Sequence, residues 1–194
     1  MRKLLLVKHA VPDIIPTLPA HTWHLSAAGQ HRCLPLARLL APYCPATIVS
    51  SREPKAAETA AHVAAHLHTA WRLGEGLHEH ERAHVGYLPR AHFDYAVAAF
   101  FAHPDELCLG QETAHQARVR FQAAIDKILG DTPAGNVIVI THGTVITLFV
   151  AHHTRLPAFP LWQRLGLPSF VVLTLPEFGL VEIVEDIGSS SQHC

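Results

Sequence analysis

Two short apolar runs, each followed within two residues by a histidine, place the strongest constraint on how this chain folds. Residues 4–7 precede His9, and residues 137–140 precede His142. Apolar runs of this length, bounded by polar residues or glycine, are typical of strands buried on both faces of a parallel sheet. Since the carboxyl ends of parallel strands meet at one edge of the sheet, we expect the two histidines to face one pocket.

Strand and helix signals alternate along most of the chain. Helices are expected from Ser26, as N-cap, to about 41, and from Thr113, where Gln116 gives capping-box spacing, to about 129. Further helices are expected over 54–67, 93–101 and 143–153, and strands over 4–7, 47–49, 70–73, 137–140, 170–175 and 180–184.

This alternation predicts an α/β fold of three layers, α/β/α, with a central mostly parallel sheet flanked by helices and an antiparallel hairpin at the C-terminal edge. We expect a single domain over residues 1–187. Within it, residues 74–110 show a looser pattern and are expected to form an inserted cap or lid. The tail, residues 188–194, is expected to be disordered.

Composition limits the class of ligand. The 194 residues are 49% hydrophobic and 16% charged, and their formal net charge is −1. Such a chain can bury one good core but offers no electrostatic footprint for nucleic acid or an anionic membrane, so a small molecule is the expected partner. The first apolar run is too short for a signal sequence or a membrane span, and we expect a cytoplasmic location.

Neither the cysteines nor the histidines indicate a metal site. The chain has 17 histidines, but the spacing of the densest group, His78, Glu79, His80 and His84, matches no compact zinc motif. We therefore expect no metal and no other cofactor. Four cysteines lack CxxC spacing, which favours reduced thiols over disulfides: Cys33, Cys44, Cys108 and Cys194.

A third loop, after the strand at 47–49, is rich in anion-binding groups. Ser51, Arg52 and Lys55 lie at the start of the following helix, where unpaired backbone N–H groups and the helix dipole favour a negative charge. Lys8 directly precedes His9 in the first loop. These donors, together with the two histidines, predict a phosphate site.

Five motifs carry a resemblance to a known family, and their order along the chain matters more than any one of them. The series resembles the histidine phosphatase superfamily, the phosphoglycerate mutase-like group, over most of the chain. The resemblance implies a phosphoglycerate mutase-like fold and a metal-independent phosphatase that hydrolyses a small phosphorylated metabolite and releases inorganic phosphate. The motifs are Lys8-His9-Ala10, Leu25-Ser26-Ala27-Ala28-Gly29, Ser50-Ser51 through Thr59-Ala60, Leu77-His78-Glu79 and Thr141-His142-Gly143.

The resemblance also implies roles for individual residues. His9 is implied as the nucleophile that becomes a phosphohistidine. Glu79 matches the proton donor, which protonates the leaving alkoxide and then activates water, and Glu81 is the neighbouring alternative. The phosphoryl oxygens would be held by His142, Lys8, Lys55, Ser51 and Arg52.

Two departures from the family pattern leave alternatives open. The family usually has arginine where Lys8 and Lys55 stand, and lysine supplies a point charge without a bidentate fork. Arg52, where the family often has proline, is a candidate to restore a fork, and Ala10 replaces the usual glycine. A catalytically weak or inactive phosphate-binding pseudoenzyme is therefore an alternative. A phosphoglycerate mutase-type phosphotransferase is less favoured, because family mutases are longer and shield their intermediate from water.

The sequence leaves the substrate and the oligomeric state undetermined. Residues 74–110, with Trp23, His24 and Tyr87, are the candidate specificity elements, and their apolar character favours a moderately hydrophobic leaving group. A homodimer is open as well, with a candidate apolar surface formed by Phe159, Leu161 and Trp162.

Overall fold

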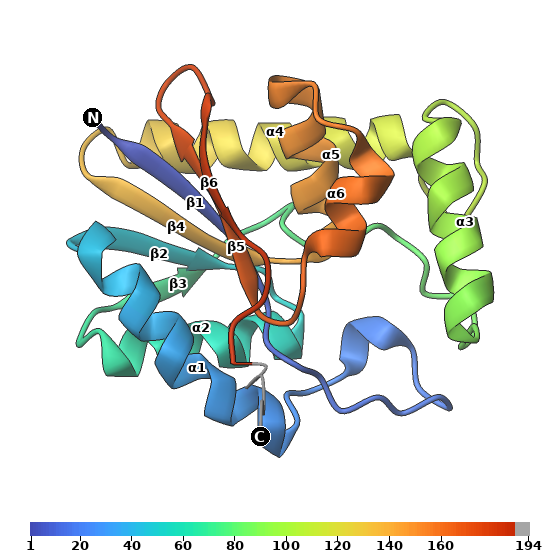
Figure 1. Ribbon diagram of the computed structural model, residues 1–194, viewed down its shortest axis with the longest axis horizontal. Coiled ribbons are helices and arrows are strands. Elements are labelled where there is room, and N and C mark those ends of the chain that lie inside the picture. Colours follow the sequence, from blue (N-terminus) through green and yellow to red (C-terminus); the bar gives the residue numbers. More distant parts are fainter. Residues whose placement is uncertain (189–194) are drawn as a thin grey trace, which may run out of the picture.

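The computed structural model describes residues 1–188, in which one mixed sheet is covered by helices on both faces (Figure 1). The strand order is β3-β2-β4-β1-β5-β6. The first four strands in sequence are mutually parallel, whereas β5 runs antiparallel to β1, and β6 antiparallel to β5. The predicted layers and C-terminal hairpin are thus confirmed. The strands are β1 (Lys3–Lys8), β2 (Ala46–Ser50), β3 (Trp71–Leu73), β4 (Asn136–Thr141), β5 (Ser169–Thr174) and β6 (Leu180–Val184).

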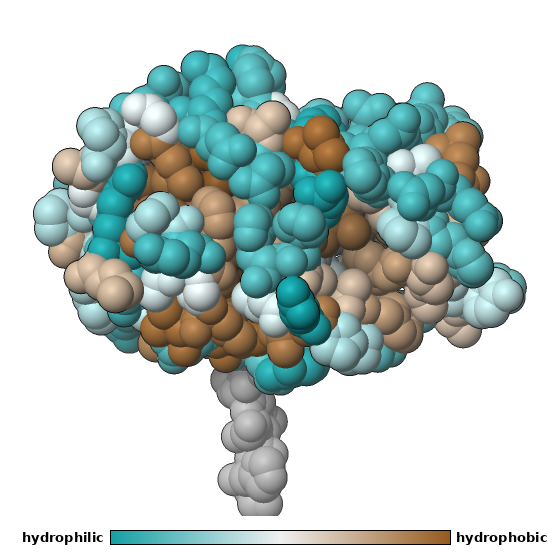
Figure 2. Space-filling view, turned by 90° about the horizontal axis from the view of Figure 1, so that it is seen from above, coloured by the Kyte–Doolittle hydropathy of each residue, from teal (hydrophilic) through white to brown (hydrophobic). Residues whose placement is uncertain are grey.

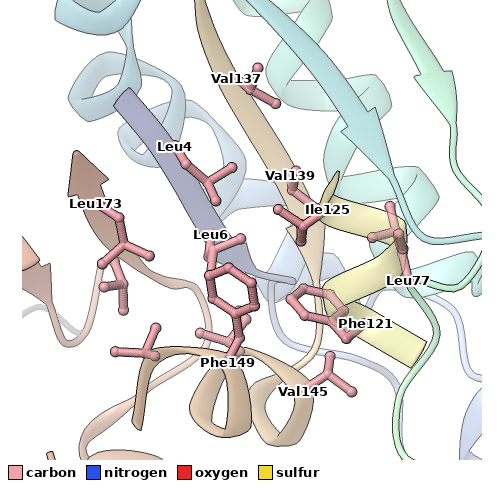
Figure 3. Close-up of a cluster of buried hydrophobic side chains, with 14 of the residues drawn as sticks. Leu4, Leu6, Leu77, Phe121, Ile125, Val137, Val139, Val145, Phe149 and Leu173 are labelled. Carbon is pink, nitrogen blue, oxygen red and sulfur yellow. The ribbon is translucent and has the colours of Figure 1, made fainter. Parts of the chain in front are cut away.

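Alternate side chains of β1 enter hydrophobic cores on opposite faces of the sheet. Leu4 and Leu6 belong to the cluster that contains Phe121 and Phe149 (Figure 3). Leu5 and Val7 belong to the cluster on the other face. Each such side chain, when fully buried, contributes about 1.5–3 kcal/mol. The strand that leads to His9 is therefore fixed from both sides.

The helices divide between the two faces of the sheet. One face is covered by α1 (Ala27–Leu40) and α2 (Pro54–His66), and the other by α4 (Ala114–Asp131), α5 (Gly143–Thr154) and α6 (Ala158–Arg164) (Figure 1). The predicted start of α1 is confirmed, since Ser26 Oγ accepts a hydrogen bond from Gly29 N–H at 3.0 Å. The predicted capping box of Thr113 and Gln116 is also present. The sequence did not predict α6, because seven residues that include Pro160 are too short to show a helical period.

The long connection from β3 to α4 extends past one end of the sheet. It contains α3 (Arg90–Ala102), which begins three residues before the predicted helix and packs beside α6 (Figure 1). Val97 and Phe100 of α3 are buried in a small cluster of their own with Trp162. The connection is therefore anchored by a separate core, while its role as a lid stays a prediction.

The prediction of an exposed apolar surface on α6 is wrong. Leu161 is 1% exposed and Trp162 9% exposed, because α6 turns them inward toward α5 and α3, and Phe159 packs against the same cluster as Trp162. On the face seen in Figure 2, hydrophobic areas are separated by hydrophilic ones. A homodimer stays a prediction, without the surface first expected for it.

Three of the four cysteines lie in the part of the chain that the structure describes. Cys33 is buried, Cys44 is half-buried and Cys108 is exposed, and all three are free thiols. Cys194 and most of the expected disordered tail, residues 189–194, lie outside the described residues. Over residues 1–188, no helix is both long and apolar enough to cross a membrane, and no cluster of three histidine, cysteine or carboxylate side chains is placed to hold a metal ion.

Candidate active site

Backbone pairing carries three loops to one edge of the sheet. The N–H of His9 donates to the carbonyl oxygen of Thr141 at 3.0 Å, and the N–H of Ser51 donates to that of Ile140 at 2.9 Å. These hydrogen bonds continue the pairing of β1 and β2 with β4 beyond the strand ends. His142 follows β4 directly, and its ring centroid lies 5.2 Å from that of His9. The structure thus brings together the two histidines expected from the sequence.

The hydrogen bond of the His9 ring fixes its tautomer. His9 Nδ1 lies 2.8 Å from the carbonyl oxygen of Ala10. Since a carbonyl oxygen can only accept, Nδ1 carries the proton and Nε2 of the neutral ring keeps its lone pair. Burial, with further contributions from His142 and Lys55, holds the pKa of His9 well below its ordinary value of 6.5. At neutral pH the ring is therefore uncharged and nucleophilic at Nε2.

His142 is completely buried beside the loop after β2. Its Nε2 lies 2.9 Å from Ser51 Oγ, which also accepts the N–H of Glu53 at 3.3 Å. A hydroxyl oxygen can both donate and accept, so Ser51 Oγ pairs with Nε2 whether Nε2 or Nδ1 carries the ring proton. Within residues 1–188 this buried Nδ1 has no hydrogen-bond partner. Burial and the charge of Lys55 hold the pKa of His142 well below 6.5, so the ring is uncharged at neutral pH.

Lys55 is buried at the start of α2 and reaches two acceptors. Its Nζ donates to the carbonyl oxygen of Ala20 at 2.7 Å and to Glu53 Oε2 at 2.5 Å. Glu53, a residue that the sequence analysis did not single out, is 8% exposed and precedes Pro54 at the first turn of the helix. A carboxylate two residues from a predicted phosphate-binding lysine was the signal available in the sequence.

Lys8 lies against the start of α5. Its Nζ donates to the carbonyl oxygen of Leu165 at 2.6 Å, and its side chain passes close to Gly143, where an added Cβ would be 3.0 Å from Lys8 Cε. Burial lowers the pKa of Lys8 to about 8, against an opposing effect of Glu79. The amine therefore changes charge within the range in which enzymes are commonly assayed.

Glu79 is directed into the site, and Glu81 is directed away from it. Glu79 Oε2 accepts the N–H of Thr144 at 3.3 Å, in the first turn of α5, and Oε1 accepts the N–H of His80 at 2.9 Å. Burial alone would raise the pKa of Glu79, but Arg82, His142 and the hydrogen bond from the N–H of His80 together outweigh burial, and the pKa is lowered. The half-exposed side chain of Glu81 pairs with His78 instead. The structure therefore places Glu79, rather than Glu81, at the start of α5.

The side chain of Arg120, for which the sequence predicted no role, binds the loop that carries Glu79. Arg120, on α4, donates to the carbonyl oxygens of Gly76, His78 and Glu79 at 2.9, 3.0 and 3.2 Å. The same guanidinium pairs with the buried carboxylate of Glu112, which in turn accepts the N–H of Glu81 at 2.9 Å. Glu112, interpreted from the sequence only as a helix-start residue, is therefore half of the ion pair that shapes this loop.

Several motif residues support the loop after His9 rather than the site itself. The N–H of Ala10 donates to Thr59 Oγ1 at 3.0 Å, and the N–H and hydroxyl of Ser26 both donate to the carbonyl oxygen of Val11. An added Cβ on Gly29 would lie 2.2 Å from that same oxygen. Only glycine permits α1 to approach the loop so closely.

Arg52 and the candidate specificity residues lie at the rim. The structure does not bring Arg52 to the histidine pair, because its mostly exposed side chain pairs with Glu75. Trp23 Nε1 donates to two carbonyl oxygens of its own loop, and His24 pairs with Glu58. Tyr87 is 54% exposed. It lines a hollow of about 150 Å³ between the loop of Pro16–Pro19 and the loop of Ala83–Tyr87.

Solved structures share this fold. A mycobacterial glucosyl-3-phosphoglycerate phosphatase in complex with VO3 is 19% identical, with a TM-score of 0.77 over 95% of this chain and 99% of that one. YhfR of Bacillus stearothermophilus is 19% identical, with a TM-score of 0.75 over 95% and 96% of the two chains. A phosphoserine phosphatase of Entamoeba histolytica in complex with 3-phosphoglyceric acid is 17% identical, with a TM-score of 0.71 over 98% of both.

A sequence comparison shows the family to which the chain belongs. Among curated protein sequences, none matches this chain. Residues 19–179, however, match the model of the histidine phosphatase superfamily (branch 1). That span is most of the chain, and it includes the loop of Ser51 and Lys55 together with Glu79 and His142. This chain therefore belongs to the histidine phosphatase superfamily, as its ordered motifs predict.

Proposed function

We propose that the protein is a metal-independent phosphomonoester hydrolase that acts on a small phosphorylated metabolite through a phosphohistidine at His9. The observation that carries the proposal is the state of the His9 ring, which is buried, neutral and protonated on Nδ1, with Nε2 free for attack. An imidazole in this state needs neither a metal nor a separate base to act as a nucleophile.

In the first step of the proposed reaction, Nε2 of His9 attacks phosphorus. A P–N bond forms, the bond from phosphorus to the leaving oxygen breaks, and that oxygen takes a proton from Glu79. The charge on the phosphoryl oxygens is stabilised by Lys8, Lys55, Ser51 and His142.

In the second step, the carboxylate of Glu79 takes a proton from water, and the water oxygen attacks phosphorus. The P–N bond breaks, inorganic phosphate leaves, and His9 returns to its neutral form. Glu79 thus moves one proton in opposite directions in the two steps.

The proton for the first step arrives with the substrate. In the free protein the pKa of Glu79 is lowered, which makes the side chain a carboxylate rather than an acid. A phosphate group bound beside it adds negative charge, and like charges favour the protonated carboxyl. A phosphomonoester has a second pKa near 6, so its monoanion can supply that proton near neutral pH.

Two observations support the proposed substrate class: the names of solved proteins with this fold and the residues at the rim of the site. The solved proteins of this fold include, by their names, phosphatases of glucosyl-3-phosphoglycerate and of phosphoserine, which are small phosphorylated metabolites. The hollow beside the rim is small and is lined partly by Leu18, Val85 and Tyr87. We propose that this rim, with residues 74–110 as its lid, receives the leaving group.

The test is steady-state hydrolysis of p-nitrophenyl phosphate in the presence of a chelator. We expect turnover by the wild type and by His31→Ala, which removes an exposed histidine on α1, and none by His9→Ala. Protein quenched in base during turnover should carry a phosphoryl adduct by mass spectrometry, and His9→Ala should not. Equal turnover by the wild type and His9→Ala would overturn the proposal.

A phosphate-binding pseudoenzyme is the second candidate, and one observation favours it. Both lysines of the site are already engaged, Lys8 by the carbonyl oxygen of Leu165 and Lys55 by Glu53. Phosphate that stabilises the wild type and His9→Ala equally, with no turnover by either, would select this candidate.

A further inference from the structure

The carboxylate of Glu53 lies among the groups proposed to hold phosphate. Glu53 Oε2 is 2.5 Å from Lys55 Nζ, and Oε1 is 3.5 Å from His142 Nε2. Oε1 also accepts the backbone N–H of Glu79 at 2.8 Å. One buried carboxylate therefore contacts a proposed phosphate-binding lysine, the second histidine and the loop of the proposed proton donor.

The position of Glu53 is fixed by the local structure. It is the N-cap of α2, followed by Pro54 at the first helical position, and its side chain does not cap its own helix. The carboxylate turns instead toward Lys55, whose side chain is as deeply buried as its own. A buried carboxylate that is paired with one cation and one N–H has its charge largely satisfied without any ligand.

We propose that Glu53 is an internal counter-anion of this site, which holds Lys55 when phosphate is absent and keeps the affinity of the site for phosphate low. The inference rests on the proposed phosphate site and adds what sets its affinity. A phosphate dianion that contacts Lys55 must share this cation with a fixed negative charge and lie near that charge. Product phosphate is then released readily, which favours turnover over retention.

The first test removes the charge of Glu53 and keeps the shape of its side chain. In Glu53→Gln, the inhibition constant of inorganic phosphate against p-nitrophenyl phosphate hydrolysis should fall by roughly tenfold or more, because a charge within a few ångströms in a buried site acts strongly. The matched control is Asp131→Asn, which makes the same change in net charge at an exposed position at the end of α4. It should leave the inhibition constant unchanged.

A second variant protects the test against a folding defect, since Glu53→Gln leaves Lys55 buried without its partner. The double variant Glu53→Gln with Lys55→Gln removes both charges, and unfolding in urea reports whether each variant is folded. If Glu53 offsets Lys55, the double variant should return the inhibition constant toward the wild-type value. If Glu53 is only structural, the double variant should bind phosphate much more weakly than the wild type, because it has lost a lysine.

Phosphate binding is also measured by calorimetry, which needs no activity. Tighter binding by folded Glu53→Gln supports the inference even if the protein proves to be a pseudoenzyme. Unchanged or weaker binding by folded Glu53→Gln overturns it, and His9-dependent hydrolysis would then still stand. Failure of the inference and failure of the proposed function therefore give different results.

Discussion

Arg120 donates a hydrogen bond to the carbonyl oxygen of Glu79 across 3.2 Å, although the two residues are 41 positions apart. The same side chain binds two more carbonyl oxygens of that loop. Because backbone carbonyls in a loop without strand pairing need other donors, a single guanidinium here replaces the hydrogen bonds of regular structure. The position of the proposed proton donor therefore depends on a helix that supplies no other group to the site.

Replacing Arg120 with methionine should lower kcat by about 10- to 100-fold, since a displacement of Glu79 by about an ångström is enough for such a loss. The loss should be larger for an alkyl phosphate than for p-nitrophenyl phosphate, whose leaving group needs little protonation. Steady-state assays with both substrates measure this difference. Equal losses would indicate a general folding defect and contradict the positioning role, and Lys127→Met, at an exposed position on α4, serves as the control.

The charge of Lys8 should limit activity at high pH. Its pKa is lowered to about 8, chiefly by burial, so the amine is charged below pH 8 and loses its charge as pH rises through that value. If that charge helps to bind phosphate, kcat/KM, which reports the free enzyme, should fall above about pH 8. Arginine stays charged throughout, so Lys8→Arg should lose this limb of the pH profile. An identical limb in Lys8→Arg would assign it to another group.

Gly29→Ala should destabilise the fold, opposite to the usual effect of alanine in a helix. The new Cβ would lie 2.2 Å from the carbonyl oxygen of Val11, which is backbone and cannot move cheaply. We expect a loss of about 1–3 kcal/mol in the free energy of unfolding, measured in urea. Gly130→Ala is the matched control, because nothing lies within 4 Å of its added Cβ, and it should be neutral or slightly stabilising. A neutral Gly29→Ala would contradict the close packing of α1 on this loop.

Thr59→Val should disturb the loop after His9 without changing side-chain volume. Thr59 Oγ1 accepts the buried N–H of Ala10 and donates to the carbonyl oxygen of Lys55. Without the hydroxyl, the N–H of Ala10 is left unpaired, whereas the carbonyl oxygen of Lys55 keeps the N–H of Thr59 as its partner within α2. We expect a loss of about 1–3 kcal/mol of stability with a lower kcat. Thr59→Ser keeps the hydroxyl and should retain most of both properties. The idea fails if valine and serine behave alike.

The sequence predicted the parts of the molecule that depend on neighbouring residues. Apolar runs located β1 and β4, and the caps at Ser26 and Thr113 located two helix starts, because both signals are local. The direction of a long polar side chain depends on residues far along the chain. Arg52 was expected at the phosphate site but pairs with Glu75, whereas Arg120 and Glu53 received no role. These side chains could be placed only once the loops were packed.

The position of β4 has a consequence for the order in which the site is assembled. β1 and β2 each pair with β4, which lies between them in the sheet although it follows both by more than 80 residues. During synthesis, the loops of His9 and Ser51 are made early but acquire their common border only when residues 136–141 are inserted between them. Until then the emerging polypeptide lacks the paired edge on which the histidines meet, so the site cannot form before residue 142 has been synthesised.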